Sequence, residues 1–269
     1  MGNSTAPTLA HHTVGNGPEK VLMLHSWIDN SHSMDNITPY LDTDAYTFVF
    51  ADLRGYGGSI DIKGEYTSTE AATDAFNLAD HLGWDRFHLM GHSMSGMISQ
   101  RAALIDWTSG KKRLKSVVAI TPVTANGYPA DEDTKGFLQS SIHNAEVASQ
   151  LAAGLTGGRL SMKYCTAVAE ANIASSSADA MLGYYNMWVG EDFSEEAKAA
   201  SIQTPLLVIA GKQDLPGFQT DYYKETFGAW YPKVEIKTID EAGHMPMYET
   251  PLILGAMVEG FLNEQTAAA

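Results

Sequence analysis

The sequence predicts an α/β fold: a mostly parallel, doubly wound sheet with a helical cap inserted into it. Short apolar runs recur along the chain, and most are continuous rather than alternating, as expected of strands that are covered on both faces. Helical patterns lie between most of these runs, which favours parallel strands joined by crossover helices. The alternation stops between about residues 122 and 201, where we find no convincing strand.

Seven segments are interpreted as strands. Residues 8–13 are assigned to an additional edge strand, and Val234, Ile236 and Ile239 form an alternating run. The remaining five segments are the continuous apolar runs Val21 to Leu24, Phe48 to Phe50, Phe87 to Met90, Val117 to Ile120 and Leu206 to Ala210.

The clearest helix of the core is predicted over Thr67 to Leu82. Thr67 and Glu70 have the spacing of a capping box, in which each residue satisfies a backbone N–H of the other. Gly83 follows directly and is expected to end the helix, as glycine commonly does. The apolar stripe that faces the core consists of Ala72, Phe76, Ala79 and Leu82.

Residues 1–122 and 201–269 are assigned to the core, and residues 123–200 to a helical cap. Short helices are predicted in the cap over Asn144 to Leu151, Leu160 to Ala171 and Ala178 to Val189. Met181, Tyr184, Tyr185 and Trp188 fit one side of the last helix, together with the neighbouring Met187. Such a stripe either packs the cap onto the core or lines a pocket, and our hypothesis is that Trp188 and Tyr184 face the substrate.

Composition limits the classes of partner. The 269 residues include 44% hydrophobic side chains, and the net charge is −15. Such an acidic surface repels phosphate backbones and anionic lipid, so we expect neither nucleic acid nor membrane as a partner, but a neutral or cationic small molecule.

The opening MGNSTAPTLAHH has no apolar stretch, and Cys165 is the lone cysteine, so a cytoplasmic protein is expected. The sequence does not determine the oligomeric state.

The segment Gly91-His92-Ser93-Met94-Ser95-Gly96 directly follows a predicted strand and opens a predicted helix. A sharp strand-to-helix turn lifts a serine hydroxyl clear of the sheet and requires small residues two positions away on either side. Ser93 is therefore the candidate nucleophile. The strict pattern Gly-x-Ser-x-Gly is not met, because Ser95 stands at the second glycine position.

An acid and a base follow Ser93 in order along the chain. Asp214 and His244 each come just after a predicted strand, so all three residues are expected at the same edge of the sheet. An imidazole activates a serine hydroxyl, and a carboxylate orients the imidazole and stabilises its cation. Three other acids are poorer candidates than Asp214: Asp240 and Glu241 lie too near His244 on its own loop to orient it easily, and Asp221 lies within the following helix.

Acyl transfer also requires N–H donors aimed at the developing oxyanion. The backbone N–H of Met94 lies at a helix N-terminus, where the helix dipole adds to its effect. The second donor is assigned to Trp27, in the His25-Ser26-Trp27 segment that ends the first core strand. The alternative is that His25 and Trp27 only pack beneath the cap.

These segments together resemble the α/β-hydrolase fold superfamily, in its serine-nucleophile, esterase-like branch with a helical cap. His25-Ser26-Trp27 is similar to the family's His-Gly-x oxyanion segment, with Ser26 in place of glycine. The run from Asp52 to Ser59 is similar to its Asp-x-Arg-Gly-x-Gly-x-Ser loop. The resemblance covers nearly the whole chain. The serine argues against the haloalkane dehalogenase and epoxide hydrolase branches, which carry an aspartate as nucleophile.

The resemblance implies a serine hydrolase that cleaves carboxylic esters of small to medium, partly apolar substrates through an acyl-enzyme. The same triad could serve a lactonase, a C–C hydrolase or a lyase, or a ligand receptor with slow residual hydrolysis. No cofactor is expected, because no phosphate-binding or dinucleotide-binding pattern is present. No metal is expected either: no Cys cluster is found, and His11, His12 and His32 have no ligand-like partners in the sequence.

Overall fold

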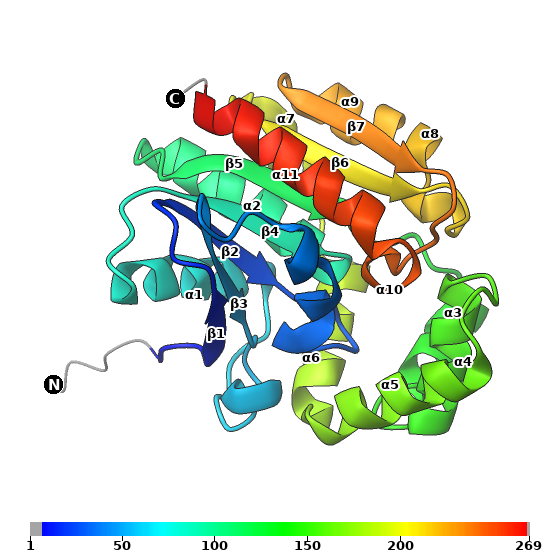
Figure 1. Ribbon diagram of the computed structural model, residues 1–269. Coiled ribbons are helices and arrows are strands. Elements are labelled where there is room, and N and C mark those ends of the chain that lie inside the picture. The colour runs from blue at the N-terminus through cyan, green and yellow to red at the C-terminus, as the bar shows by residue number, and fades with distance from the viewer. Residues whose placement is uncertain (1–6, 268–269) are drawn as a thin grey trace, which may run out of the picture.

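A twisted sheet forms the centre of the molecule (Figure 1). The computed structural model describes residues 7–267, and within them seven strands are ordered β1-β3-β2-β4-β5-β6-β7. The edge strand β1 is antiparallel to β3, and every other pair is parallel. The strands are β1 (His11–Val14), β2 (Glu19–Leu24), β3 (Tyr46–Ala51), β4 (Phe87–His92), β5 (Leu114–Ile120), β6 (Leu206–Gly211) and β7 (Val234–Ile239).

The central strands are buried on both faces, which explains their continuous apolar runs. Successive residues point to opposite faces, so Leu89 joins one hydrophobic cluster and Met90 the other. Val117 and Val118 of β5 divide in the same way. Two separate layers of helices are therefore needed to cover the sheet.

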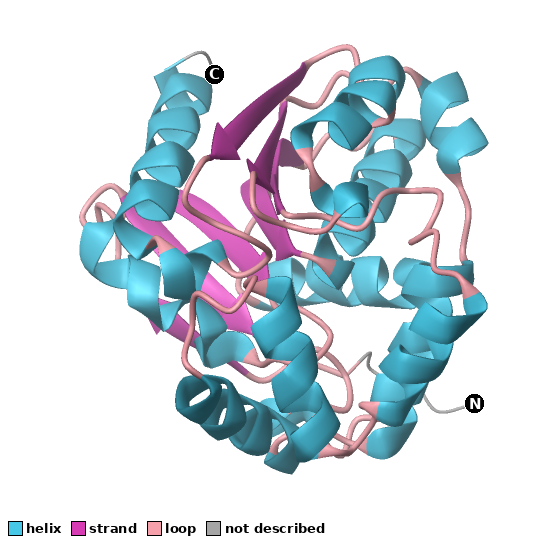
Figure 2. Cartoon of the chain, turned by 90° about the vertical axis from the view of Figure 1, so that its right-hand side faces the viewer, coloured by secondary structure: helices cyan, strands magenta, loops and turns pink. Residues whose placement is uncertain are grey.

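Figure 2 shows helices on both sides of the sheet. One side is covered by α1 (Ser68–His81), α2 (Met94–Ser109), α7 (Ser194–Ala200), α8 (Thr220–Glu225) and α9 (Phe227–Trp230). The other side is covered by the 3₁₀ helix η1 (Ser31–Tyr40), α10 (Pro246–Glu249) and α11 (Pro251–Ala267). Two short 3₁₀ turns, η2 (Gly57–Ser59) and η3 (Pro216–Phe218), lie in loops.

The predicted core strands are all present, and each of the five continuous runs extends by one to three residues in total. The edge strand begins at His11 rather than at residue 8. Helix α1 has Thr67 as its N-cap, and the Thr67 hydroxyl accepts from the Glu70 N–H at 3.1 Å. The reciprocal half of the capping box is wrong, because the Glu70 carboxylate accepts from the N–H groups of Glu65 and Tyr66 instead.

Four helices lie together beyond the carboxyl ends of the strands, at the lower right in Figure 1. They are α3 (Glu132–Ser140), α4 (Ala145–Leu155), α5 (Met162–Ala174) and α6 (Ala178–Gly190). Helix α3 has no counterpart among the predicted helices, because it holds one buried apolar residue, Leu138, and so lacks an apolar stripe. Helix α7 follows α6 and packs against α2. The division at residues 123 and 200 stays a prediction.

No helix within residues 7–267 is long and apolar enough to cross a lipid bilayer. Residues 1–6, on which the expected lack of a secretory leader partly depends, lie outside the described residues.

Candidate active site

Ser93 occupies a strained turn between β4 and α2. Its backbone φ and ψ angles are 52° and −113°, a conformation that residues other than glycine rarely adopt. The Ser93 N–H donates to the carbonyl of Ile120 at 2.9 Å. The turn has no space for a side chain at Gly91 or Gly96. A Cβ on Gly91 would lie 2.1 Å from the Ser95 carbonyl oxygen, and a Cβ on Gly96 would lie 2.2 Å from Pro122. The small residues therefore permit a backbone that presents the Ser93 hydroxyl.

The structure brings Ser93, His244 and Asp214 into one hydrogen-bonded chain. His244 Nε2 lies 2.8 Å from Ser93 Oγ, and His244 Nδ1 lies 2.8 Å from Asp214 Oδ2. Because an ionised carboxylate only accepts, Nδ1–H donates to Asp214 and Nε2 accepts from the serine. The Leu215 N–H donates to the other carboxylate oxygen at 2.7 Å. All three side chains are buried, so the chain is shielded from bulk water.

The competing acids lie elsewhere. Asp240 is 66% exposed and pairs with Lys212 at 3.0 Å, and Asp221 pairs with Lys224 on the surface. Glu241 is exposed. Asp214 is thus the carboxylate that contacts His244.

The two backbone N–H groups expected to bind an oxyanion have no hydrogen-bond acceptor among the described residues. These are the N–H groups of Met94, the first residue of α2, and of Trp27, in the loop after β2. Trp27 is also packed, since its indole N–H donates to the carbonyl of Met181 in α6 at 2.7 Å. The side chain therefore anchors the cap while the backbone N–H stays available for an oxyanion.

His25 shapes the loop that carries Trp27. Its Nδ1–H donates to the Ser26 carbonyl at 2.7 Å, and its Nε2 accepts from the Leu53 N–H at 3.1 Å. Burial lowers the pKa of His25, so the ring stays neutral and keeps this tautomer. The Ser95 hydroxyl donates to the His25 carbonyl. His25 is therefore hydrogen-bonded to both Ser26 and Ser95, the two serines that stand at the glycine positions of the motifs.

Ser26, the departure from the His-Gly-x segment, lines the cavity beside Ser93. Its hydroxyl makes no hydrogen bond to any other described residue.

Two side chains hold the backbone of His244. His92 Nε2–H donates to the His244 carbonyl at 2.9 Å, and the Thr121 hydroxyl donates to the same oxygen at 3.0 Å. Burial lowers the pKa of His92 to about 3, so this histidine is neutral and positions His244 without exchanging a proton.

Glu249 organises the loop around His244 and was missed by sequence reasoning. Its carboxylate accepts from the N–H groups of Gly243 and Met245, both at 3.0 Å. It also pairs with Arg159, from the connection between α4 and α5, at 2.6 Å. No motif marks this residue, because it acts through backbone bonds that only the folded loop creates.

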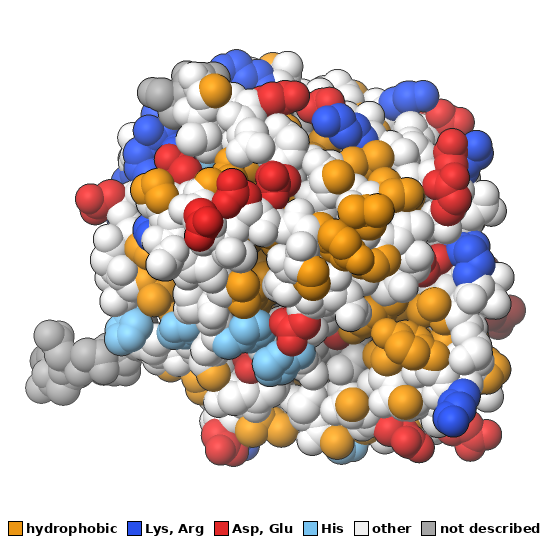
Figure 3. Space-filling model, in the orientation of Figure 1, with side chains coloured by type: hydrophobic (Ala, Val, Ile, Leu, Met, Phe, Trp, Pro, Cys, Tyr) orange, Lys and Arg blue, Asp and Glu red, His pale blue; other side chains and the backbone are white. Residues whose placement is uncertain are grey.

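A cavity of about 330 Å³ opens above Ser93 and His244 between the core and the cap. Its wall is mostly apolar and includes Leu138, Leu155 and Val168, with Phe137 and Leu215 partly exposed near its rim. Figure 3 shows hydrophobic side chains gathered on the side of the molecule where α10 and the cap helices lie. The volume and lining are those of a small-ligand site.

The hypothesis that Trp188 and Tyr184 face the substrate is wrong for Tyr184. Trp188 lines the cavity, where it contacts Trp27 with ring centroids 5.3 Å apart. Tyr184 does not line it: it is fully buried against Tyr56 and Tyr66. The two residues are four apart on α6, but Trp188 lies near its C-terminal end, where it also contacts Tyr128, whereas Tyr184 packs onto the core.

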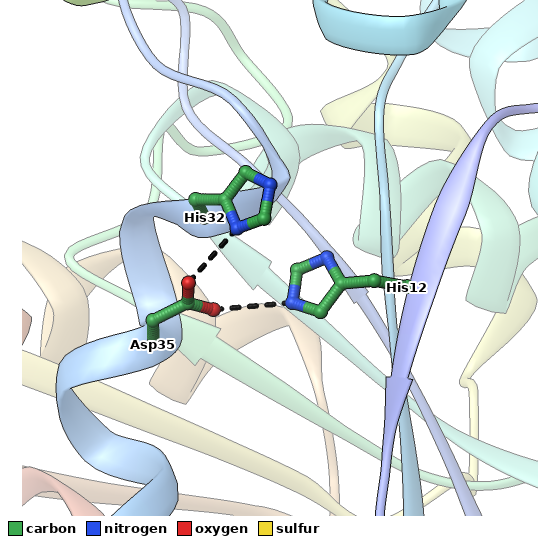
Figure 4. A group of neighbouring side chains, drawn as sticks. All are labelled: His12, His32 and Asp35. Atoms are coloured by element: carbon green, nitrogen blue, oxygen red, sulfur yellow. Dashed lines mark hydrogen bonds and ion pairs between the residues drawn. The ribbon is translucent and has the colours of Figure 1, made fainter.

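The statement that His12 and His32 have no ligand-like partners is wrong. Histidines gather on one face (Figure 3), and His12 and His32 both contact Asp35, at 3.1 and 2.8 Å (Figure 4). Their rings are stacked, with centroids 4.5 Å apart and 10° between the planes. An imidazole binds a metal ion in the plane of its ring, so both rings could share an ion only after one of them turned.

Comparisons with known proteins agree on the fold. The model of a family described as alpha/beta hydrolase fold matches residues 20–251. A fluoroacetate dehalogenase of Burkholderia sp is 41% identical over 95 residues, which are 34% of this chain and 31% of the dehalogenase. An esterase from Exiguobacterium antarcticum superposes with a TM-score of 0.80 at 16% identity, covering 95% of both chains. The enol-lactonase of Burkholderia xenovorans gives 0.79 at 18% identity, covering 95% of this chain and 96% of the lactonase.

Proposed function

This chain belongs to the alpha/beta hydrolase fold family, and on that premise we propose that it is a serine hydrolase that cleaves carboxylic esters. One observation carries the proposal: Ser93, His244 and Asp214 are joined by two hydrogen bonds of 2.8 Å at the floor of an apolar cavity. A nucleophile, its base and the group that orients the base are the parts that acyl transfer requires.

In the proposed mechanism Ser93 attacks the ester carbonyl while His244 Nε2 takes the hydroxyl proton. Asp214 stabilises the resulting imidazolium, and the N–H groups of Met94 and Trp27 bind the oxyanion. His244 then protonates the leaving alkoxide. Water, deprotonated by the same nitrogen, hydrolyses the acyl-enzyme and restores Ser93.

The cavity supports small to medium, partly apolar substrates. Its volume of about 330 Å³ is at the lower end for small-molecule sites. Among the described residues, neither lysine nor arginine lines it, so a substrate carboxylate would have no cationic partner. This argues against an acidic substrate even though the matched third of the chain is similar to a dehalogenase named for fluoroacetate.

A steady-state screen tests the proposal. Purified protein is assayed with p-nitrophenyl esters from acetate to octanoate, with aliphatic lactones and with β-diketones. We expect ester turnover, and we expect Ser93→Ala to remain folded and lose at least about a thousandfold in kcat, because triad residues act as a unit. Turnover of lactones or diketones alone would replace the ester proposal by one of those chemistries.

Asp240→Asn is the matched control for the acid. Asp214→Asn removes the carboxylate that orients His244 and should lower kcat by a comparable factor, whereas Asp240 only pairs with Lys212 at the surface and should be neutral. Equal effects of both substitutions would remove Asp214 from the mechanism. A ligand receptor would instead turn over every ester very slowly while a bound ligand raised its Tm.

A further inference from the structure

Asp29 is a buried carboxyl in the wall of the active-site cavity. It is 4% exposed and lies in the loop after β2, two residues beyond Trp27. Three donors from different segments converge on its Oδ1 atom: the Asn30 N–H at 3.1 Å, the Asn172 side-chain amide of α5 at 3.3 Å and the Tyr248 hydroxyl of α10 at 3.4 Å. The carboxyl is thus held in a fixed position between core and cap.

No cation balances this carboxyl. Within residues 7–267, no lysine, arginine or histidine forms an ion pair with Asp29, and neither lysine nor arginine lines the cavity. A buried carboxylate without a cationic partner is costly, since desolvation opposes its ionisation. Burial accordingly raises the pKa of Asp29 to about 7, although hydrogen bonds from its neighbours oppose the rise.

The hydrogen-bond network does not require the charge. All three of these bonds end on one oxygen, which an asparagine side chain would provide equally well. Asn172 is also held independently, because its amide donates to the Ile28 carbonyl at 3.0 Å and its oxygen accepts from Asn30 at 3.1 Å. A structural anchor between the cap and the loop would therefore work with a neutral residue at position 29.

We propose that Asp29 is a specificity-determining residue that binds a protonated amine on the substrate. The proposal rests on the proposed ester hydrolysis and names its substrate class: esters that carry an ammonium group at the end of an otherwise apolar chain. An ammonium supplies the missing positive charge and up to three donors to the carboxylate. The net charge of −15 favours the approach of the same cations.

Matched ester pairs test this. At pH 8, kcat/KM is measured for p-nitrophenyl esters whose acyl chains of four, six and eight carbons end either in a methyl or in an ammonium group. We expect the wild type to prefer the ammonium member at one chain length by at least tenfold. Asp29→Asn should abolish that preference, while Asp44→Asn, an acid outside the cavity, should keep it.

Asn172→Ala separates recognition from anchoring. This variant loosens the anchor but leaves the Asp29 carboxylate, so the ammonium preference should survive with a lowered Tm. If Asn172→Ala and Asp29→Asn lower Tm alike and neither changes the preference, or if the wild type shows no preference, Asp29 is only an anchor and the proposal fails.

Failure of the proposed function gives a different result. If no ester is cleaved, binding of hexylammonium is measured on the intact protein by titration calorimetry, with Asp29→Asn as the comparison. Binding that Asp29→Asn weakens at least tenfold would retain the ammonium site in a protein that is not an esterase. Equal or absent binding in both proteins would reject the site.

Discussion

Ser95 fills the second glycine position of the nucleophile turn with a residue that also makes a contact. Its hydroxyl donates to the carbonyl of His25, and its own carbonyl accepts from Ser99 at 2.8 Å. The hydroxyl therefore connects the start of α2, which carries the Met94 N–H, to the loop that carries the Trp27 N–H. One side chain fixes the spacing of the two proposed oxyanion donors.

We predict that Ser95→Ala lowers kcat roughly tenfold and lowers the stability by about 1–2 kcal/mol, because the buried His25 carbonyl loses its donor. Steady-state kinetics and denaturant unfolding measure the two effects. Ser95→Gly restores the family pattern but not the hydroxyl, so it should lose at least as much. Wild-type kcat in both variants would show that the contact is dispensable.

The raised pKa of Asp29 predicts that the stability of the fold depends on pH. The pKa is about 7 in the folded protein against 3.8 for the ordinary group, so between about pH 4 and pH 7 the folded state holds a proton that the unfolded state has lost. This contribution to stability is complete below about pH 4, falls progressively as the pH rises, and is lost once the pH has passed 7. The tyrosines that face Asp29, namely Tyr56, Tyr164 and Tyr248, have raised pKa values and stay neutral throughout.

Asp29→Asn removes the carboxyl that takes up this proton, because an amide side chain does not ionise. We expect its Tm, relative to that of the wild type, to rise by at least about 3 °C between pH 5 and pH 8. Thermal unfolding at the two pH values measures it, with Asp44→Asn as the exposed control. A Tm difference that is the same at both pH values would show that Asp29 titrates like an ordinary carboxyl.

At the scale of elements, the cap is linked to the loop of His244. The His244 N–H donates to the carbonyl of Leu155 at the end of α4, at 3.0 Å. Arg159, just beyond α4, pairs with Glu249, whose carboxylate accepts from the N–H groups on both sides of His244. The base of the proposed triad is therefore held in part by the cap.

Three variants separate the two roles of the Glu249 carboxylate, which are to accept backbone hydrogen bonds and to carry the charge that pairs with Arg159. Glu249→Ala removes both acceptors, so we predict a loss of at least about tenfold in kcat and a lower Tm. Glu249→Gln keeps one amide oxygen and should retain most of the activity. Arg159→Met removes a partly exposed guanidinium and leaves the buried Glu249 carboxylate with its two N–H donors, so we predict a smaller loss of Tm than in Glu249→Ala. Steady-state kinetics and thermal unfolding rank the three, and an inactive Arg159→Met would instead make the ion pair essential.

At the scale of the whole molecule, the charge of −15 surrounds a cavity without lysine or arginine. If ammonium esters are the substrates, this field assists their approach and is screened by salt. We predict that raising NaCl from 10 to 200 mM increases KM for an ammonium ester severalfold and leaves KM for its methyl-ended partner unchanged. A parallel change in both would attribute the effect to the protein rather than to attraction of the cation.

Much of the fold could be predicted because it depends on local patterns. Continuous apolar runs marked the strands of a sheet buried on both faces, and the order of Ser93, Asp214 and His244 after three strand ends predicted that they would meet. Helix α3 was missed, since one buried leucine does not make a periodic stripe. Tyr184 and Trp188 looked equivalent, because a sequence does not reveal which distant side chains each of them contacts.

The sequence by itself determined the strand-helix alternation, the small residues of the nucleophile turn and the identity of the three hydrogen-bonded side chains. Those features follow from backbone sterics and from the period of apolar residues, which are properties of neighbours along the chain. Only the tertiary structure decided that Asp29 is buried without a cation, that Glu249 supports His244 and that Ser95 contacts His25. Burial and partnership of a polar side chain are set by segments far away in the sequence, so they exist only after the chain has packed.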